Sequence, residues 1–175
     1  MRMLSADVKT QIRTIYKGIS AALPDFRSRR EQNYIVAEIS KTLAGEYDKQ
    51  RRIIVVEAGT GIGKSLAYIL GSIPLALANK KKVCIATATV ALQEQLLHKD
   101  LPFFLAQSEL NFTFGLVKGR QRYVCLSKLQ LLTGPDDGTQ MAMWQTKPDN
   151  SQIALLQSLF KHYHEGKWNG ERDTL

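Results

Sequence analysis

The sequence is poor in cysteine and has no long hydrophobic run. Its 175 residues include two cysteines, Cys84 and Cys125. Two cysteines cannot form a disulfide framework, so we expect a reducing, cytoplasmic environment. No apolar stretch approaches the roughly 18 residues that a membrane-spanning helix needs, and residues 1–20 lack the apolar segment of a signal peptide. These absences exclude secreted mini-proteins and integral membrane proteins, and we expect no membrane partner.

The residues that are abundant are apolar or basic. Apolar residues make up 44% of the chain, which is enough for a buried core, and the formal net charge is +8. The charge is uneven, because residues 131–175 carry a net −2 and residues 1–130 a net +10. Each short basic cluster by itself is more typical of a solvated loop. Their concentration in one stretch nevertheless predicts a polyanionic partner.

Apolar patterning predicts an α/β fold for residues 1–118. Continuous apolar runs at 53–56 and 83–86 indicate strands, the first of them typical of a strand buried on both faces, and 112–117 resembles a third strand. Spacings of three and four predict helices over 5–22, 31–44, 63–79 and 90–106, the first capped by Ser5. Strands that alternate with helices predict a parallel, RecA-like sheet with flanking helices. This sheet is incomplete, because no further strand is visible after residue 118. Residues 134–138 indicate a loop and 152–164 a helix.

Residues Ala58–Ser65 read AGTGIGKS and match a phosphate-binding loop (P-loop) between a strand and a helix. Glycines let the backbone curl so that its N–H groups face phosphate oxygens, and the following helix aims its positive dipole end at the same place. Lys64 would supply a point charge to the phosphates and Ser65 a hydroxyl to Mg²⁺. The predicted nucleotide-binding residues of the loop are Ala58, Gly59, Thr60, Gly61, Ile62, Gly63, Lys64 and Ser65.

Two further segments suggest neighbouring contacts. Arg29 and Gln32 lie at the start of the second predicted helix, and a glutamine amide can read an adenine edge. By themselves they are more typical of surface helix residues. Residues 87–96 read TATVALQEQL, in which hydroxyls at a strand end precede a helix N-terminus and could hold a DNA phosphate. Thr89 is equally suited to be only a helix cap.

In this order the segments resemble the motifs of a helicase family. Arg29-x-x-Gln32, EAGTGIGKS (57–65) and TATVALQEQL (87–96) are similar to the Q motif, motif I and motif Ia of superfamily 2 helicases. KGRQRYVC (118–125) is similar to the beginning of the iron–sulfur domain of XPD-like helicases. The resemblance is strongest to the bacterial DinG-type ATP-dependent DNA helicases. HKDLPFF (98–104) and KWNGERD (167–173) extend it over essentially the whole chain.

The resemblance implies roles for the matching residues. ATP and Mg²⁺ would bind the P-loop, with Gln32 contacting adenine and Arg29 supporting it. Cys125 would be the first of four thiolate ligands of a [4Fe–4S] cluster. The residues implied to contact the backbone of single-stranded DNA are Thr87, Thr89, Gln95, Arg120 and Arg122.

The resemblance also implies an activity and a domain plan. The activity is ATP-driven, 5′ to 3′ translocation of a monomer on single-stranded DNA and unwinding of tailed duplexes in DNA repair or replication. Residues 1–118 would be the first part of the ATP-binding domain. Residues 119–175 would begin a small, mainly helical iron–sulfur domain.

The sequence lacks parts that such a helicase needs. It has no Asp-Glu dipeptide, which these enzymes use to hold Mg²⁺ and orient the attacking water. Cys84 falls in a strand expected to be buried, which leaves Cys125 as the one candidate cluster ligand. We therefore expect an N-terminal portion that does not hydrolyse ATP efficiently alone. Two alternatives stay open: a non-catalytic nucleotide- or nucleic-acid-binding module from a truncated gene, and a small P-loop kinase.

Several residues are expected to be structural rather than functional. The histidines, His98, His162 and His164, are expected at the surface, since the last two lie on different faces of one helix. The aromatic residues Trp144, Tyr163 and Trp168 could stack on bases, but we expect them to pack a small helical subdomain.

Overall fold

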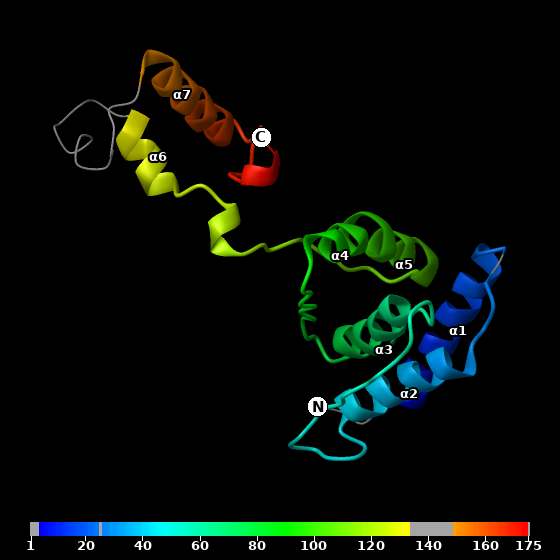
Figure 1. Cartoon of the computed structure of the whole chain (residues 1–175). Coiled ribbons are helices and arrows are strands. Elements are labelled where there is room, and N and C mark those ends of the chain that lie inside the picture. Colours follow the sequence, from blue (N-terminus) through cyan, green and yellow to red (C-terminus); the bar gives the residue numbers. More distant parts are fainter. Residues whose placement is uncertain (1–3, 25, 134–148, 175) are drawn as a thin grey trace. The chain divides into compact units, whose positions relative to one another are not determined.

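The computed structural model describes residues 4–24, 26–133 and 149–174. The chain divides into two compact units, Met1–Leu116 (unit 1) and Val117–Leu175 (unit 2). Figure 1 shows that both units are built from helices joined by irregular segments. The division falls close to residue 118, where the sequence pattern changes. None of the helices among the described residues is long and apolar enough to cross a membrane.

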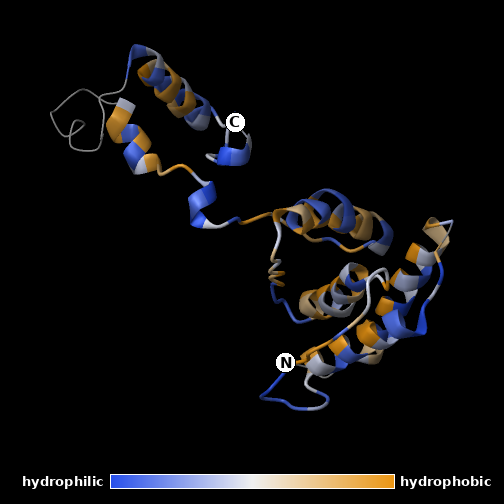
Figure 2. Cartoon of the chain, in the orientation of Figure 1, coloured by the Kyte–Doolittle hydropathy of each residue, from blue (hydrophilic) through white to orange (hydrophobic). Residues whose placement is uncertain are grey.

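The helices of unit 1 confirm three of the four expected helical segments, those over 5–22, 31–44 and 63–79. The helices of this unit are α1 (Ala6–Ala22), α2 (Arg30–Ala44), α3 (Lys64–Ala78), α4 (Val90–Gln95) and α5 (Leu101–Ser108). Ser5 caps α1 as expected, because its hydroxyl accepts a hydrogen bond from the backbone N–H of Val8 at 3.2 Å. Apolar (orange) and polar (blue) residues alternate along the α1 ribbon in Figure 2, as an amphipathic helix requires.

The segment expected to be one helix over 90–106 is interrupted. A π-helical turn, η1 (Leu96–Asp100), separates α4 from α5. Pro102 is the second residue of α5, and it has no N–H to donate to a carbonyl of the preceding turn. The backbone N–H of Leu101 donates to the carbonyl of Leu96, which widens the turn by one residue.

The core of unit 1 forms where α1, α2, α3 and α5 pack together. Its largest fully buried side chains include Ile19, Ile69, Leu70 and Phe104. At Gly71 the backbone of α3 approaches α2 so closely that an added Cβ would lie 2.9 Å from Cγ2 of Ile39. The buried hydroxyl of Ser40 lies 2.8 Å from the Val36 carbonyl of its own helix and 3.0 Å from the Gly71 carbonyl. A small residue and a bridging hydroxyl thus fix the contact between α2 and α3, the helix that follows the P-loop.

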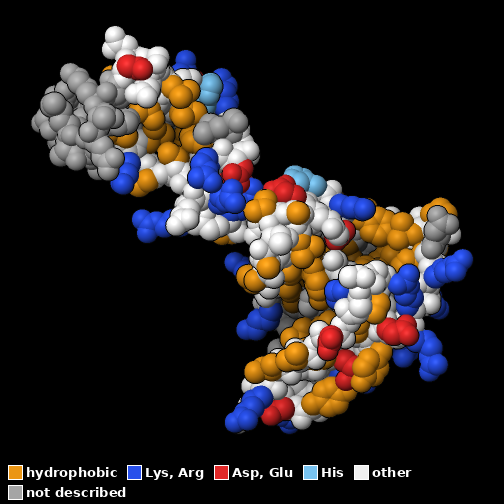
Figure 3. All heavy atoms as spheres, in the orientation of Figure 1, with side chains coloured by type: hydrophobic (Ala, Val, Ile, Leu, Met, Phe, Trp, Pro, Cys, Tyr) orange, Lys and Arg blue, Asp and Glu red, His pale blue; other side chains and the backbone are white. Residues whose placement is uncertain are grey.

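The predicted parallel sheet is wrong. Among the described residues no strand is formed, and the segments 53–56, 83–86 and 112–117 carry no strand pairing. Ile53, Val55 and Val117 have 79, 92 and 84% of their surface exposed. Cys84 is also exposed, so the expectation that it packs in a core is wrong as well. Figure 3 shows apolar side chains at the visible surface of unit 1.

The physical reason is that a strand is defined by its partners. A β-branched run fits a pleated, buried segment, but the N–H and C=O groups of that segment need a neighbouring strand. In unit 1 the helices supply the core instead, and the extended segments connect them. Phe112 still packs beside Phe104, with ring centroids 6.2 Å apart, so part of the third apolar run contacts the core without forming a strand.

The described residues of unit 2 form two helices and two short 3-10 turns, and ion pairs join the first and last segments of the unit. Its described elements are η2 (Arg120–Arg122), α6 (Leu126–Thr133), α7 (Asn150–His164) and η4 (Arg172–Thr174). The expected helix over 152–164 is confirmed, and Asp149 caps it in a reciprocal pair with Gln152. The loop expected at 134–138 lies outside the described residues. An isolated antiparallel bridge joins Tyr123 to Glu171, so the two ends of the unit lie side by side.

Candidate functional site

The P-loop leads directly into the N-terminus of α3. Gly61 and Gly63 have φ angles of +76° and +84°, a left-handed conformation that residues with a Cβ rarely adopt. Gly63 is the N-cap and Lys64 the first helical residue of α3. The first backbone N–H groups of α3 have no partner within the helix and carry its positive dipole end. The arrangement is suited to bind an anion at this place.

Lys64 lies over its own loop. Its Nζ donates hydrogen bonds to the carbonyl of Ala58 at 3.0 Å and to that of Gly59 at 2.8 Å, and its side chain is exposed. Ala58 and Ile62 pack against the core, while Thr60 lies in the exposed turn. The loop is thus anchored by apolar residues and presents the Lys64 ammonium at its surface.

Arg29 and Gln32 of the α2 region also reach this loop. The guanidinium of Arg29, at the N-cap of α2, donates to the carbonyl of Gly61. Nε2 of Gln32 donates to the carbonyl of Gly63 at 3.1 Å, and Gln32 is only 3% exposed. A Cβ on Gly63 would collide with the Gln32 amide at its present place, so the amide would have to move. Two residues about 30 positions upstream therefore donate hydrogen bonds to carbonyls of the P-loop. The sequence around Arg29 and Gln32 did not predict these contacts.

Sequence reasoning missed Tyr16. Its hydroxyl lies 3.2 Å from Oε1 of Gln32 and 3.1 Å from Oγ of Ser28, and its ring packs edge-on against Phe26. Tyr16 follows Ile12 by four residues, so it lies beside the buried face of α1. The apolar periodicity identifies that face, but no local motif marks Tyr16 as a partner of the P-loop.

The residues present are suited to Mg²⁺ but not to a [4Fe–4S] cluster. Ser65 stands in the first turn of α3 beside Lys64, where a hydroxyl can serve Mg²⁺ bound to phosphates. A [4Fe–4S] cluster does not fit this chain, because two cysteines cannot supply the usual four thiolates. Cys84 belongs to unit 1 and Cys125 to unit 2, and both are exposed. The described residues contain no group of three or more His, Cys, Asp or Glu side chains suited to a metal.

The residues expected to contact DNA in unit 1 have contacts inside the chain. Oγ1 of Thr89 accepts from the backbone N–H of Leu92 at 3.3 Å, which is the helix-cap role considered for it. The hydroxyl of Thr87 donates to the Thr89 carbonyl at 3.2 Å. Nε2 of Gln95 donates to a carboxylate oxygen of Asp100 at 2.9 Å. All three lie around the start of α4 and η1, and Thr89 and Gln95 are exposed.

The basic residues at the start of unit 2 differ in exposure: Lys118 is buried, Arg122 is partly exposed and Arg120 is exposed. Nζ of Lys118 forms an ion pair with Glu171, and these side chains are only 5 and 9% exposed. Arg122 lies 3.0 Å from an Asp173 carboxylate oxygen, and Lys118 lies 3.5 Å from the other. Burial opposes ionisation of Asp173, but the hydrogen bond and charge of Arg122, aided by Lys118, lower its pKa. Arg120 is exposed, which makes it the better placed of the two predicted arginines for an outside anion.

The other aromatic and histidine residues are mostly where they were expected. His98, His162 and His164 are exposed. Trp168 is 9% exposed, and its indole N–H donates to the Glu171 carbonyl at 2.8 Å, which confirms a packing role. Trp144 lies outside the described residues.

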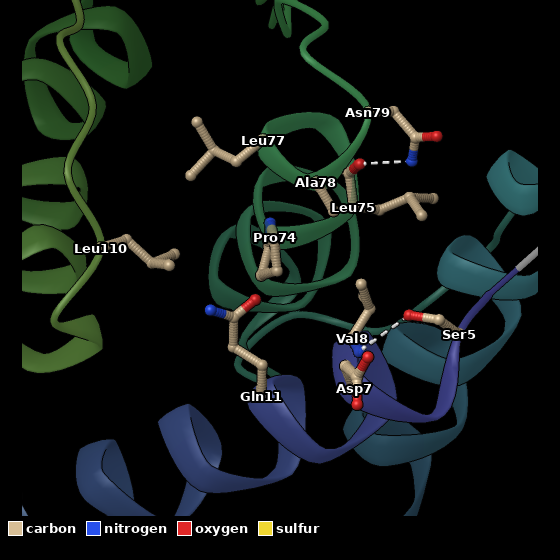
Figure 4. A pocket seen from close by; sticks show the side chains of 10 residues that line it. All are labelled: Ser5, Asp7, Val8, Gln11, Pro74, Leu75, Leu77, Ala78, Asn79 and Leu110. Carbon is tan, nitrogen blue, oxygen red and sulfur yellow. Dashed lines mark hydrogen bonds between the residues drawn. The ribbon is translucent and has the colours of Figure 1, made fainter. Parts of the chain in front are cut away.

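A pocket of about 440 Å³ opens at the opposite end of α3 (Figure 4). It is lined by the first turns of α1, the last turn of α3 and Leu110. A helix of 15 residues is about 22 Å long, so this pocket is remote from the P-loop. None of the residues predicted for the functional site lines it.

Comparison with known proteins identifies a family of similar sequences. The chain is 51% identical over 172 residues to the "ATP-dependent DNA helicase DinG" of Photobacterium profundum, a match that covers 98% of this chain and 25% of that protein. It is 36% identical over 178 residues to the protein of the same name from Escherichia coli K12, and 35% over 175 residues to that of Salmonella choleraesuis. The chain thus spans about a quarter of the length of these relatives. No family model matches it.

Proposed function

We propose that this chain, a homologue of the DinG ATP-dependent DNA helicases over nearly its whole length, supplies the ATP-binding P-loop of such an enzyme. The observation that carries the proposal is the convergence of Lys64, Arg29 and Gln32 on one glycine-rich loop at the N-terminus of α3. Loop, cation and helix terminus together form a site for phosphate groups.

The contacts of Lys64 support a role in phosphate binding. Its ammonium is held by two neutral carbonyls, of Ala58 and Gly59, at an exposed position. A phosphate oxygen carries negative charge and makes a stronger, charge-assisted hydrogen bond than a carbonyl does. The β- and γ-phosphates of ATP would therefore compete successfully for Lys64, with the Ser65 hydroxyl placed for Mg²⁺.

The proposed reaction partner is DNA. The basic excess in residues 1–130 and the exposed Arg120 favour a polyanion, and the relatives are named DNA helicases. In the whole protein we propose translocation on single-stranded DNA, 5′ to 3′, and unwinding of tailed duplexes. The chain itself would bind ATP with little turnover, because its sequence contains no Asp-Glu pair.

Titration with a fluorescent ATP analogue tests the nucleotide part of this function. We expect saturable binding with a Kd of roughly 1 μM–1 mM in the presence of Mg²⁺, reversed by unlabelled ATP and weakened by EDTA. Phosphate release over the same period should stay near the background rate. Absence of saturable, ATP-reversible binding would contradict the proposed function.

Charge reversal at Arg120 tests the DNA part. Arg120→Glu should weaken binding of a fluorescent single-stranded oligonucleotide across all base sequences, and should reduce the dependence of log Kd on log salt by about one unit or more. Fluorescence anisotropy at several salt concentrations measures both. Lys128→Glu, at an exposed position on α6, is the control for the same change in net charge. Equal effects of the two reversals would show that Arg120 has no particular place on a DNA path.

A further inference from the structure

A chain of hydrogen bonds connects helix α1 to the P-loop through Gln32. The Gln32 amide has its Nε2 3.1 Å from the Gly63 carbonyl and its Oε1 3.2 Å from the Tyr16 hydroxyl. The Tyr16 hydroxyl is also 3.1 Å from Oγ of Ser28, and Nδ2 of Asn33 is 3.1 Å from the same Oγ. One end of this chain is therefore the N-cap carbonyl of α3.

The direction of each hydrogen bond in this chain follows from its ends. The Gly63 carbonyl can only accept, so Gln32 donates to it through Nε2, and Oε1 is left to accept. A tyrosine hydroxyl has one proton, which Tyr16 therefore gives to Oε1 of Gln32. Ser28 is then the donor to Tyr16, and Asn33 the donor to Ser28. Each of these donors and acceptors has a hydrogen-bond partner in only one orientation of the Gln32 amide.

We infer that Tyr16 is a positioning residue of the nucleotide site, which acts through Gln32 on the P-loop and does not contact the base. This inference rests on the proposed function. Gln32 is 3% exposed, so its amide is committed to Gly63 and Tyr16 and has little surface for a ligand. Gly63 lies so close to this amide that an added Cβ would displace it, and Gly63, with a φ of +84°, is the N-cap that precedes Lys64 in α3.

Loss of the Tyr16 hydroxyl would leave the Gln32 amide held at one end. Oε1 of Gln32 would be buried without its hydrogen-bond donor, while Nε2 would keep its hydrogen bond to the Gly63 carbonyl. An amide that is fixed at one end has more freedom to move against Gly63, so the N-cap of α3 would be held less firmly. The effect would reach every ligand that binds the P-loop through its phosphates, whatever base it carries.

Tyr16→Phe, tested with two ligands, distinguishes this role from base recognition. Binding of Mg²⁺-ATP and of Mg²⁺-tripolyphosphate, which has no base, is measured by calorimetry on the full chain. We expect both affinities to fall by the same factor, at most about 5-fold, which corresponds to one hydrogen bond of about 1 kcal/mol. Tyr34→Phe, at a tyrosine of α2 that is 67% exposed, is the matched control and should change neither affinity. Ser28→Ala should have a smaller effect, because the Tyr16 hydroxyl still donates its hydrogen bond to Gln32.

The outcomes separate this inference from the proposed function. If ATP binding falls and tripolyphosphate binding does not, Tyr16 acts on the base and the inference is wrong. If Tyr16→Phe behaves as Tyr34→Phe does, Tyr16 has no role and only the inference fails. If the unmodified chain binds neither ligand, the proposed function fails and the inference with it. Far-UV circular dichroism of each variant establishes that α1 and α2 remain folded, and Tyr16→Trp serves as a second variant without the hydroxyl if Tyr16→Phe unfolds.

Discussion

Replacement of Lys64 by alanine is expected to abolish most ATP binding while leaving unit 1 folded. The variant loses a charge-assisted contact to phosphate worth about 2–3 kcal/mol, which corresponds to a Kd about 30–150-fold weaker. The internal hydrogen bonds that it also loses end on carbonyls of Ala58 and Gly59 in an open part of the chain, where water can replace the ammonium. Competition titration against a fluorescent ATP analogue measures the affinity, and thermal unfolding checks the fold.

A lysine at the other end of the same helix is the control for net charge. Lys82→Ala removes an exposed ammonium beyond the end of α3 and should leave ATP affinity within a factor of about two. An equal loss in both variants would mean that ATP senses only the general positive charge of unit 1. Unchanged binding in Lys64→Ala would mean that nucleotide does not bind at the P-loop.

Replacement of Glu171 by alanine is expected to unfold unit 2 or to destabilise it strongly. Lys118 is 5% exposed at its side chain, and the variant would leave its ammonium buried without the nearest carboxylate. Breaking a buried pair costs about 3–5 kcal/mol when the remaining charge has no other partner. Asp173 still lies 3.5 Å from Lys118 and reduces this cost, but the loss that remains is a large part of the stability of a unit this small. Hydrogen exchange at the Val124 amide, which donates to the Gly170 carbonyl at 2.9 Å, reports on unit 2 alone.

Two further variants decide whether the buried charge is the cause. The double variant Lys118→Met with Glu171→Leu removes both charges and should restore protection of the Val124 amide, because a buried ion pair can be replaced by apolar residues at little cost. Lys161→Ala removes the exposed partner of a surface pair with Glu165 and should cost only about 0.3–0.5 kcal/mol. Equal effects of Glu171→Ala and Lys161→Ala would show that burial of the Lys118–Glu171 pair has no energetic consequence.

The helices show how far a local pattern reaches. The α1 boundary was predictable because the cap and the apolar stripe are both local, as Ser5, Val8 and Ile12 show. The same holds for Thr89, whose hydroxyl caps α4. The π-turn η1 was not predicted, because it depends on how Pro102 perturbs hydrogen bonding in a turn that precedes it.

The strands show where a local pattern stops. The run at 53–56 has the composition of a buried strand, yet Val55 is 92% exposed and the segment has no pairing. Composition describes what a segment can do when partners are present on both edges. Whether partners are present is a property of contacts between distant segments, and the sequence of the run contains no information on it.

The candidate site combines both kinds of information. The P-loop, with Gly61, Gly63 and Lys64, was predicted from eight consecutive residues, because phosphate binding needs those residue types at that spacing. Arg29 and Gln32 were a weak signal in the sequence that the family resemblance strengthened, and the structure places both on carbonyls of the P-loop. The buried Lys118–Glu171 pair links positions 53 residues apart and had no signal in either local sequence.

The sequence by itself therefore indicated most of the helices and the similarity to DinG helicases, and it predicted a phosphate-binding loop, since each of these depends on residues close together or on direct comparison of residues. Only the tertiary structure decided that helices rather than a sheet form the core of unit 1. It also placed Tyr16 behind Gln32 and buried Lys118 against Glu171. The reason is physical: hydrogen bonds and ion pairs between distant segments depend on where the packed core brings those segments, and local spacing does not fix that position.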